Sequence, residues 1–446
     1  MRALLALAGP LVGANLLQMG VYAIDVMFVA RLGPVDFAAA TLGVFLFGLV
    51  LWALLGLATA CAPIIAAELG RKRHAVREVR RSFRMALWVA ILVPLPFMLL
   101  LANGETVFRF AGQDPLVARR ADAFLDILLF GLIPSVAGGV MRTVAAALGR
   151  PGWALGVTAL ALMIAALGNW LLVFGHWGLP ALGLEGSALA SLITSIATLI
   201  AYGVIFATDP KLRRYRLFGR WWRPEWSRFA EIVRLGTPIA LAFTLEGALF
   251  GGAAILMGLI SVTAVAAHAV ALNIASIMFQ IPLGIAQATT IRVGRAFGAG
   301  DHAAIGRAGW IGIATGTSIM ALTALAILIA PRLFMSAYLD LDAPANAATI
   351  ALASQFLLVA AMFQLLDGAQ VVLAGALRGL QDTQMPMLIA GIGYWGIGFT
   401  TAILLAFWLG WQGVGIWLGL AAGLLAVSLL LGWRWARRAA LRLLPS

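Results

Sequence analysis

The sequence predicts an all-α integral membrane protein with twelve transmembrane helices, arranged as two parallel repeats of six helices. The composition, the spacing of the apolar runs and a match between the two halves of the chain predict this fold. Of the 446 residues, 63% are hydrophobic and only 11% are charged, and the mean hydropathy is +0.99. A soluble domain typically carries about 25% charged residues. The composition therefore excludes an ordinary soluble globule.

Twelve apolar runs are long enough to cross a bilayer, which takes about 20 helical residues. They cover residues 4–31, 37–68, 85–103, 119–148, 153–175, 184–207, 237–260, 264–297, 307–330, 346–377, 385–408 and 413–433. The longer runs are expected to tilt or to extend beyond the membrane. The first run continues through Tyr22 to Ala30, which is too long for the apolar core of a signal peptide, so we interpret it as a retained helix. The eleventh contains the glycine-rich stretch GIGYWGIG, which predicts close helix contact.

The basic residues gather in alternate loops. With the N-terminus inside, one set of loops holds 26 of the 31 Lys and Arg residues. Cytoplasmic loops of membrane proteins are enriched in Lys and Arg, so we predict a cell (inner) membrane protein with both termini in the cytoplasm. The net charge of +13 then suits anionic membrane lipid and not nucleic acid. The longest polar link, residues 209–236, is rich in Arg and Trp and predicts an amphipathic interfacial linker.

The halves on either side of this linker resemble one another. A shift of 228 positions places Pro10 on Pro238 and Gly70 on Gly298 without a gap, which indicates an internal duplication. The predicted lobes are residues 1–208 and 237–446. Because each lobe has an even number of helices, both enter the membrane from the same side. In transporters built from repeats, the substrate site lies where the repeats meet.

Carboxylates inside the apolar runs are the main functional signal. Glu246 lies near the middle of the seventh run, and Asp25 and Asp367 repeat this anomaly. A charge at the centre of a membrane helix costs roughly 2.5–3.5 kcal/mol or more, so such residues usually mark an ion or substrate path. The alternative is a carboxylate paired with an arginine, but no run carries Lys or Arg in its middle. Arg142 and Arg378, near helix ends, are expected to snorkel or to cap their helices.

Aromatic and amide side chains accompany these carboxylates. Rings beside a carboxylate suit organic cations, through charge pairing and cation–π attraction. In a poorly hydrated site each carboxylate can hold a proton or accept Na⁺ and exchange it for a cationic substrate. The supporting residues are Gln18, Tyr22 and Asn169 in the first lobe, and Phe243, Phe250, Phe363, Gln364 and Gln370 in the second. For the three in the first lobe, a structural hydrogen bond between helices is an equal or better explanation, and Asn169 could donate to a carboxylate of a neighbouring helix.

An integral-membrane enzyme acting on lipids is the alternative from a different class. It would need a His, Ser or metal cluster at one interface, whereas the sequence has no HExxH, GxSxG or CxxC motif and its four His residues are scattered. The sequence therefore favours a secondary active transporter, with no cofactor beyond a coupling ion, H⁺ or Na⁺.

Four stretches resemble the multidrug and toxic compound extrusion (MATE) family, and among its branches the NorM type. They are QMGVYAIDVMFVARLGPVDFAAATLG, FGHWGLPALGLEGSALA, IMFQIPLGIAQATTIRVGRAFGAG and LLDGAQVVLAGALRGLQDTQMP. The resemblance implies the MOP-flippase-type architecture, in which two six-helix lobes form a V-shaped cavity. It also implies cation-driven antiport that exports lipophilic organic cations. The expected partners are cationic hydrophobic small molecules and membrane lipid, and the expected state is a monomer.

The resemblance further implies that Glu246, Asp367 and Asp25 bind the coupling ion and the substrate, with a possible Na⁺ at Glu246 and Asp367. Two departures leave the ion open, with a tilt towards H⁺. Phe363 stands one turn before Asp367, where NorM-type members can offer a tyrosine, and Val173 stands one turn after Asn169, where other branches have a second Asp.

A flippase for lipid-linked precursors has the same architecture and is the runner-up. Its anionic headgroups would call for Arg or Lys along the cavity, which this chain keeps near its predicted cytoplasmic ends. The duplication also separates the carboxylates, because the 228-residue shift places Gln18 on Glu246 and Asp25 on Ala253. We therefore expect Glu246 and Asp367 to work as a pair and Asp25 to act separately.

Overall fold

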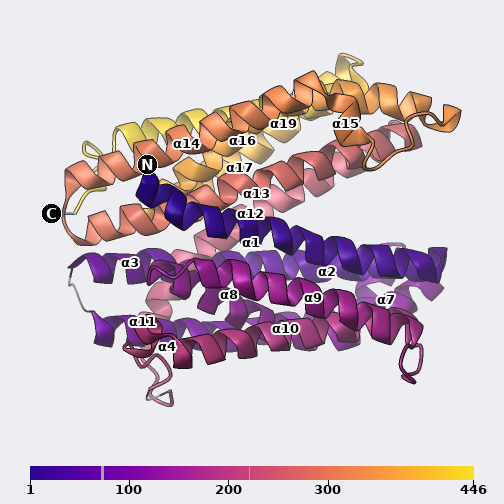
Figure 1. Cartoon of the computed structure of the whole chain (residues 1–446). Helices are drawn as coiled ribbons and strands as arrows, with labels where there is room; N and C mark the ends of the chain where they lie inside the picture. Colours follow the sequence, from indigo (N-terminus) through magenta and orange to yellow (C-terminus); the bar gives the residue numbers. More distant parts are fainter. Residues whose placement is uncertain (72–74, 220, 446) are drawn as a thin grey trace. The chain divides into compact units, whose positions relative to one another are not determined.

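A computed structural model describes residues 1–71, 75–219 and 221–445. These residues form helices and their connections, with no β-strand among them, and twelve helical segments are long and apolar enough to cross a membrane. The predicted all-α membrane fold is thus confirmed (Figure 1). Lys72, Arg73 and Arg220, which belong to the basic loops counted above, and His74, one of the four scattered histidines, lie outside the described ranges.

The spans lie close to their predicted positions. They cover Arg2–Leu32, Pro34–Arg71, Val76–Leu101, Pro115–Ala147, Gly152–Phe174, Gly183–Thr208, Trp226–Gly258, Val262–Gly298, His302–Ile329, Pro344–Gly379, Gln384–Trp408 and Gln412–Ala436. The seventh begins earlier than the apolar run, at Trp226, so the end of the predicted linker is helical.

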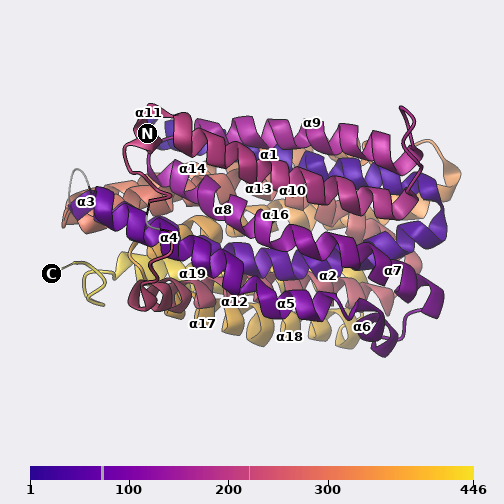
Figure 2. The same ribbon diagram turned by 90° about the horizontal axis from the view of Figure 1, so that it is seen from below.

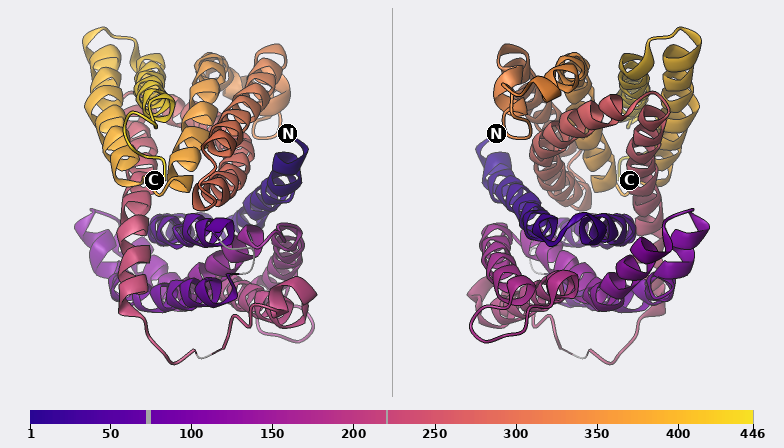
Figure 3. Two further views of the ribbon diagram at one scale, coloured as in Figure 1. Left: turned by 90° about the vertical axis from the view of Figure 1, so that its left-hand side faces the viewer. Right: turned by 90° about the vertical axis from the view of Figure 1, so that its right-hand side faces the viewer.

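The chain forms two compact units. The N-terminal unit comprises Gly13–Ala240, and the C-terminal unit comprises Met1–Val12 together with Leu241–Ser446. Figure 3 views the helices of each unit end-on. The predicted lobes differ from these units at two places, since the first helix of each half is divided between the units.

The N-terminal unit contains the helices from α1 to α11 and the beginning of α12. They are α1 (Arg2–Val29, from Gly13 on), η1 (Ala30–Leu32), α2 (Pro34–Ala58), α3 (Cys61–Arg71), α4 (Val76–Leu92), α5 (Pro94–Leu101), α6 (Gly104–Phe110), α7 (Pro115–Leu128), η2 (Leu129–Gly131), α8 (Leu132–Ala147), α9 (Gly152–Phe174), α10 (Gly183–Thr208), α11 (Pro210–Arg213) and α12 (Trp226–Gly258, as far as Ala240). Proline is tolerated at the first helical position, because its missing N–H would be unpaired there. This explains the start of α5 at Pro94, which divides the third span. Figure 2 shows α9 and α10, which pack along each other.

The C-terminal unit contains the rest of α12 and the helices that follow. They are α13 (Val262–Gly298), α14 (His302–Ile329), α15 (Pro331–Met335), η3 (Pro344–Asn346), α16 (Ala347–Gly379), α17 (Gln384–Gly391), the π-helical η4 (Ile392–Phe399), α18 (Thr400–Ile403), the π-helical η5 (Leu404–Trp408) and α19 (Gln412–Ala436). Its core includes the fully buried rings of Phe356 and Trp417. The close contact predicted for the glycine-rich eleventh span is present, since a Cβ at Gly398 would lie 3.1 Å from Gly423 Cα.

The boundaries of the units fall at equivalent positions of the two repeats. One lies after Val12 in α1 and the other after Ala240 in α12, and the 228-residue shift superimposes these two residues. Each boundary follows a proline inside the helix, Pro10 in α1 and Pro238 in α12. The beginning of each repeat's first helix therefore belongs to a different compact unit from the rest of that helix.

Each of these helix beginnings lies very close to the backbone of a neighbouring helix, and a glycine stands at each point of contact. In the C-terminal unit, a Cβ on Gly284 of α13 would lie 2.8 Å from the backbone nitrogen of Val12. In the N-terminal unit, a Cβ on Gly236 of α12 would lie 2.7 Å from the carbonyl oxygen of Leu57 in α2. A side chain does not fit at such distances, so both contacts need glycine.

Candidate functional site

Asp367 lies in α16 of the C-terminal unit and is only 5% exposed. Gln370, one turn later, donates from Nε2 to Asp367 Oδ1 at 3.4 Å. The Tyr394 hydroxyl in turn donates to Gln370 Oε1 at 2.9 Å. Tyr394 comes from the π-helical segment η4, and π-helical turns within longer helices frequently occur at functional sites. Asp367, Gln370 and Tyr394 therefore form one continuous hydrogen-bonded chain.

Glu246 of α12 belongs to the same group of polar residues. It is half-buried and close enough to interact electrostatically with Asp367, Tyr394 and Arg378. We call Glu246, Asp367, Gln370, Tyr394 and Arg378 the C-terminal polar cluster. Two carboxylates that share a poorly hydrated site repel each other when both are charged, so a proton or a cation between them is favoured.

Arg378 does not lie as the sequence predicted. Its guanidinium carbon is 5.1 Å from the ring centroid of Phe243, and it interacts electrostatically with Glu246. The expectation that Arg378 snorkels or caps its helix is therefore wrong, because the side chain turns towards α12. Phe243 is only 7% exposed. Its ring already faces a cation of the protein itself, the Arg378 guanidinium.

The other aromatic residues predicted beside the carboxylates pack against one another. Phe363 is 1% exposed, and its ring lies edge-on to Phe250 at 6.0 Å and to Trp417 at 5.7 Å. Gln364, also 1% exposed, accepts a hydrogen bond from Thr323 Oγ1 at 3.2 Å. Phe363 is thus a core residue in this structure, and other rings cover its own.

Asp25 of α1 is held by two other helices of the N-terminal unit. Asn169 of α9 donates from Nδ2 to Asp25 Oδ1 at 2.7 Å, and Ser191 of α10 donates to Asp25 Oδ2 at 3.1 Å. The same Asn169 amide donates to the carbonyl of Ala165 at 2.9 Å, and Asn169 is fully buried. The hydrogen bond that the sequence suggested for Asn169 is present. Ser191 was missed, because one Ser among other small residues of a membrane helix gives no signal.

The remaining residues of the Asp25 stripe are less tightly held. Tyr22 is 45% exposed and interacts electrostatically with Asp25 and Arg142. Gln18 is half-buried, and among the described residues its side chain makes no hydrogen bond. Arg142 of α8 donates to Asn15 Oδ1 of α1. The expectation that Arg142 snorkels or caps its helix is therefore also wrong.

Within the described ranges, no group of three or more His, Cys, Asp and Glu residues could hold a metal ion. The oxygen atoms available to a monovalent ion are carboxylate, amide and hydroxyl oxygens. In the N-terminal unit these include Asn169 Oδ1, which is buried and has no hydrogen-bond partner in the described part of the chain. In the C-terminal unit they include the carboxylates of Glu246 and Asp367.

Comparisons with known proteins agree with this architecture. The family model described as MatE matches residues 10–171 and again residues 238–404. The two matches begin at Pro10 and Pro238, the pair of residues that the 228-residue shift superimposes. The chain is 48% identical over 437 residues to a probable multidrug resistance protein NorM of Mesorhizobium japonicum, covering 98% of this chain and 94% of the relative. It is 45% identical over 438 residues to one of Brucella suis, covering 98% and 93%.

Solved structures of the same fold are more distant in sequence. The eukaryotic MATE transporter AtDTX14 superimposes with a TM-score of 0.87 at 21% identity, covering 99% of this chain and 98% of that one. A mutant of the Vibrio cholerae MATE transporter VcmN gives 0.86 at 17% identity, covering 99% and 97%. The family matches over both repeats, the curated relatives and the twelve spans lead to one conclusion. The chain belongs to the MatE family and is a multi-pass membrane transporter, not an enzyme.

Proposed function

We propose that this protein exports lipophilic organic cations and takes up H⁺ or Na⁺ in exchange. Multidrug efflux is supported by the relatives named multidrug resistance proteins and by the family match. The observation that carries the ion-coupled mechanism is the C-terminal polar cluster. There, two carboxylates interact electrostatically inside membrane-spanning helices, and one of them is fixed through Gln370 by Tyr394.

The cluster supports exchange by competition for the same negative charge. An organic cation and a coupling ion both need an ionised carboxylate, so binding of one weakens binding of the other. Arg378 adds a resident cation beside Glu246, which offsets one of the two negative charges. A net charge of −1 then remains at the cluster for a monovalent cationic substrate or coupling ion. The burial of Phe363, where a tyrosine could have served as a Na⁺ ligand, favours H⁺ at this cluster.

The remaining features of the proposal follow from the sequence. Alternation between inward-open and outward-open states would release the cation outside. The distribution of Lys and Arg supports cytoplasmic termini in the cell (inner) membrane, and we propose a monomer surrounded by lipid. A flippase for anionic lipid precursors is less well supported, because the arginine of the cluster lies beside Glu246 and Phe243.

The test is ethidium transport in proteoliposomes with an imposed pH or Na⁺ gradient. We expect one of the gradients to drive transport by the wild type, and the Glu246→Gln and Asp367→Asn variants to lose that dependence. Glu185→Gln is the matched control, because Glu185 is an exposed acid in the first turn of α10. Transport that both cluster variants still drive with the same gradient and at the wild-type rate would contradict the mechanism.

A further inference from the structure

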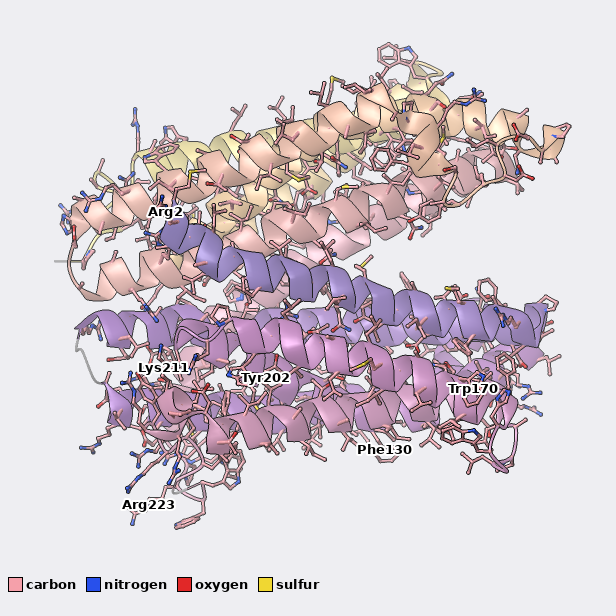
Figure 4. All side chains as sticks on the ribbon, viewed as in Figure 1. Arg2, Phe130, Trp170, Tyr202, Lys211 and Arg223 are labelled. Atoms are coloured by element: carbon pink, nitrogen blue, oxygen red, sulfur yellow. The ribbon has the colours of Figure 1, made fainter. Side chains whose placement is uncertain are left out.

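The connector between α10 and α12, described here over residues 209–219 and 221–225, carries cations that the transport sites do not use. Five of its basic residues are exposed: Lys211, Arg213, Arg214, Arg216 and Arg223. Figure 4 shows Lys211 and Arg223 at one end of the helices of the N-terminal unit. The connector joins the last residues of the sixth span to the first residues of the seventh, so it lies at the depth where phospholipid headgroups meet water.

The connector is fixed to the N-terminal unit by its apolar residues. Leu212, Tyr215 and Leu217 alternate with the cations and are at most 3% exposed. The backbone is held as well, since Arg80 Nε donates to the carbonyl of Tyr215 at 3.2 Å. A chain segment that is anchored at every second or third residue presents its cations in a defined arrangement.

The acids of the connector are already occupied. Asp209 accepts hydrogen bonds from Trp153 Nε1 at 2.9 Å and from the backbone of Lys211 at 2.8 Å, and pairs with Arg150 at 3.2 Å. Burial raises the pKa of Asp209, but these hydrogen bonds and Arg150 outweigh it, so the pKa lies below its usual value. Glu225 forms ion pairs with Arg81 and Arg84 of α4. Neither acid is therefore free to neutralise the exposed cations.

Neighbouring cations at the same end of the unit are treated differently. Arg71 and Arg228 pair with Glu68 at 3.5 and 3.3 Å, and Arg228 also pairs with Glu231 at 2.8 Å. In the described part of the chain, by contrast, no ion pair involves Lys211, Arg213, Arg216 or Arg223, and Arg214 stacks on the Tyr215 ring at 5.0 Å. The fold thus neutralises one set of cations and leaves the connector set without counter-charge.

Large exposed rings accompany the connector cations. Trp222 is 74% exposed, Trp226 is 60% exposed and Phe218 is 43% exposed. Indole rings favour the headgroup region of a bilayer, where one end of the ring is apolar and the other polar. Cations alone would suit any polyanion, but cations beside exposed indoles at the end of membrane spans suit an anionic lipid surface.

We infer that the connector is a binding site for the headgroups of anionic phospholipids. The phosphates would lie against Lys211, Arg213, Arg216 and Arg223, and the acyl chains next to Trp222 and Trp226. This site goes beyond the proposed transport function and does not depend on it. A transporter that proves to use another substrate would still bind these lipids.

The test is native mass spectrometry of the detergent-solubilised full chain, titrated with phosphatidylglycerol or with phosphatidylcholine of the same acyl chains. We expect the wild type to bind phosphatidylglycerol at least about tenfold more tightly, and less so as salt is raised. The variant with Lys211, Arg213, Arg216 and Arg223 all changed to Gln should lose this preference. Trp222→Ala should weaken the binding of both lipids.

A charge-matched control separates this site from general surface charge. It changes Arg2, Arg307, Arg437 and Arg442 to Gln, four exposed cations outside the connector, and should keep the preference. An equal loss in this control would overturn the inference, as would displacement of the lipid by inorganic phosphate at the lipid's own concentration. Unchanged thermal unfolding of the connector variant in lipid-free detergent shows that it is folded. A folded connector variant that retains the wild-type preference overturns the inference.

Discussion

The two polar sites of this transporter differ although their scaffolds are copies. In the C-terminal unit, Asp367 has a second carboxylate nearby and is restrained through Gln370 by Tyr394. In the N-terminal unit, Asp25 is held directly at both oxygens, by Asn169 and Ser191. The duplication has kept the helices but neither the polar residues nor the position of the glycine at each close contact, since the 228-residue shift places Ala8 on Gly236. The first site combines several charges, whereas the second is a single carboxylate in a fixed position.

The largest expected effect compares the two carboxylates directly. Asp367→Asn removes a charge from the cluster in which ion and substrate are proposed to compete. We expect gradient-driven ethidium transport to fall at least about tenfold, within the range of typical coupling free energies. Asp25→Asn should reduce it less, because an amide oxygen can still accept from Ser191. Initial rates, normalised to the protein reconstituted, measure both variants. A greater loss for Asp25→Asn would reverse the assignment of the main coupling site.

The next effect tests whether the close contacts at the beginnings of α1 and α12 stabilise their units to the same extent. Gly284→Ala and Gly236→Ala each place a Cβ within 2.8 Å of a backbone atom. Overpacking of this kind typically costs about 1–3 kcal/mol, so both variants should unfold at a lower temperature in detergent. Gly247→Ala in α12 is the control, because no atom lies within 4 Å of its added Cβ. A lower unfolding temperature in only one of the two variants would show that the two contacts do not stabilise their units equally.

The Asp25 site allows a smaller, local comparison. Asn169→Leu keeps a side chain of similar size but removes the donor to Asp25 Oδ1. Hydrogen bonds between membrane helices contribute about 0.6 kcal/mol on average and up to roughly 1.7 kcal/mol, and this one is made to a carboxylate at 2.7 Å. We expect a loss of stability near the upper value, measured by thermal unfolding. Leu167→Ala, at an exposed position of α9, should leave the stability almost unchanged. An unaltered unfolding temperature for Asn169→Leu would show that the bond adds nothing.

The sequence predicted the scaffold better than the partners within it. Twelve spans, the duplication and the Asn169 contact followed from local composition and spacing. Tyr394 was missed because GIGYWGIG was interpreted only as a packing motif, and its hydrogen-bond partner Gln370 lies on another helix. Arg378 was misplaced because proximity to a helix end does not determine which way a long side chain turns. Inside a membrane, apolar residues cover both faces of a helix, so periodicity does not identify the face that meets a partner.

The smallest expected effect distinguishes a hydroxyl that donates directly to a carboxylate from one that acts on a carboxylate through a second side chain. Ser191→Ala removes a hydroxyl that donates to Asp25 itself, whereas Tyr394→Phe removes one that acts on Asp367 only through Gln370. Each should cost about 0.6 kcal/mol of stability, so thermal unfolding should not distinguish them. If the C-terminal polar cluster couples transport, Tyr394→Phe should still change the dependence of ethidium transport on the driving gradient more than Ser191→Ala does. The freed Gln370 amide can then rotate, and Asp367 loses its fixed donor. Equal gradient dependence in the two variants would show that Tyr394 only packs the eleventh span against α16.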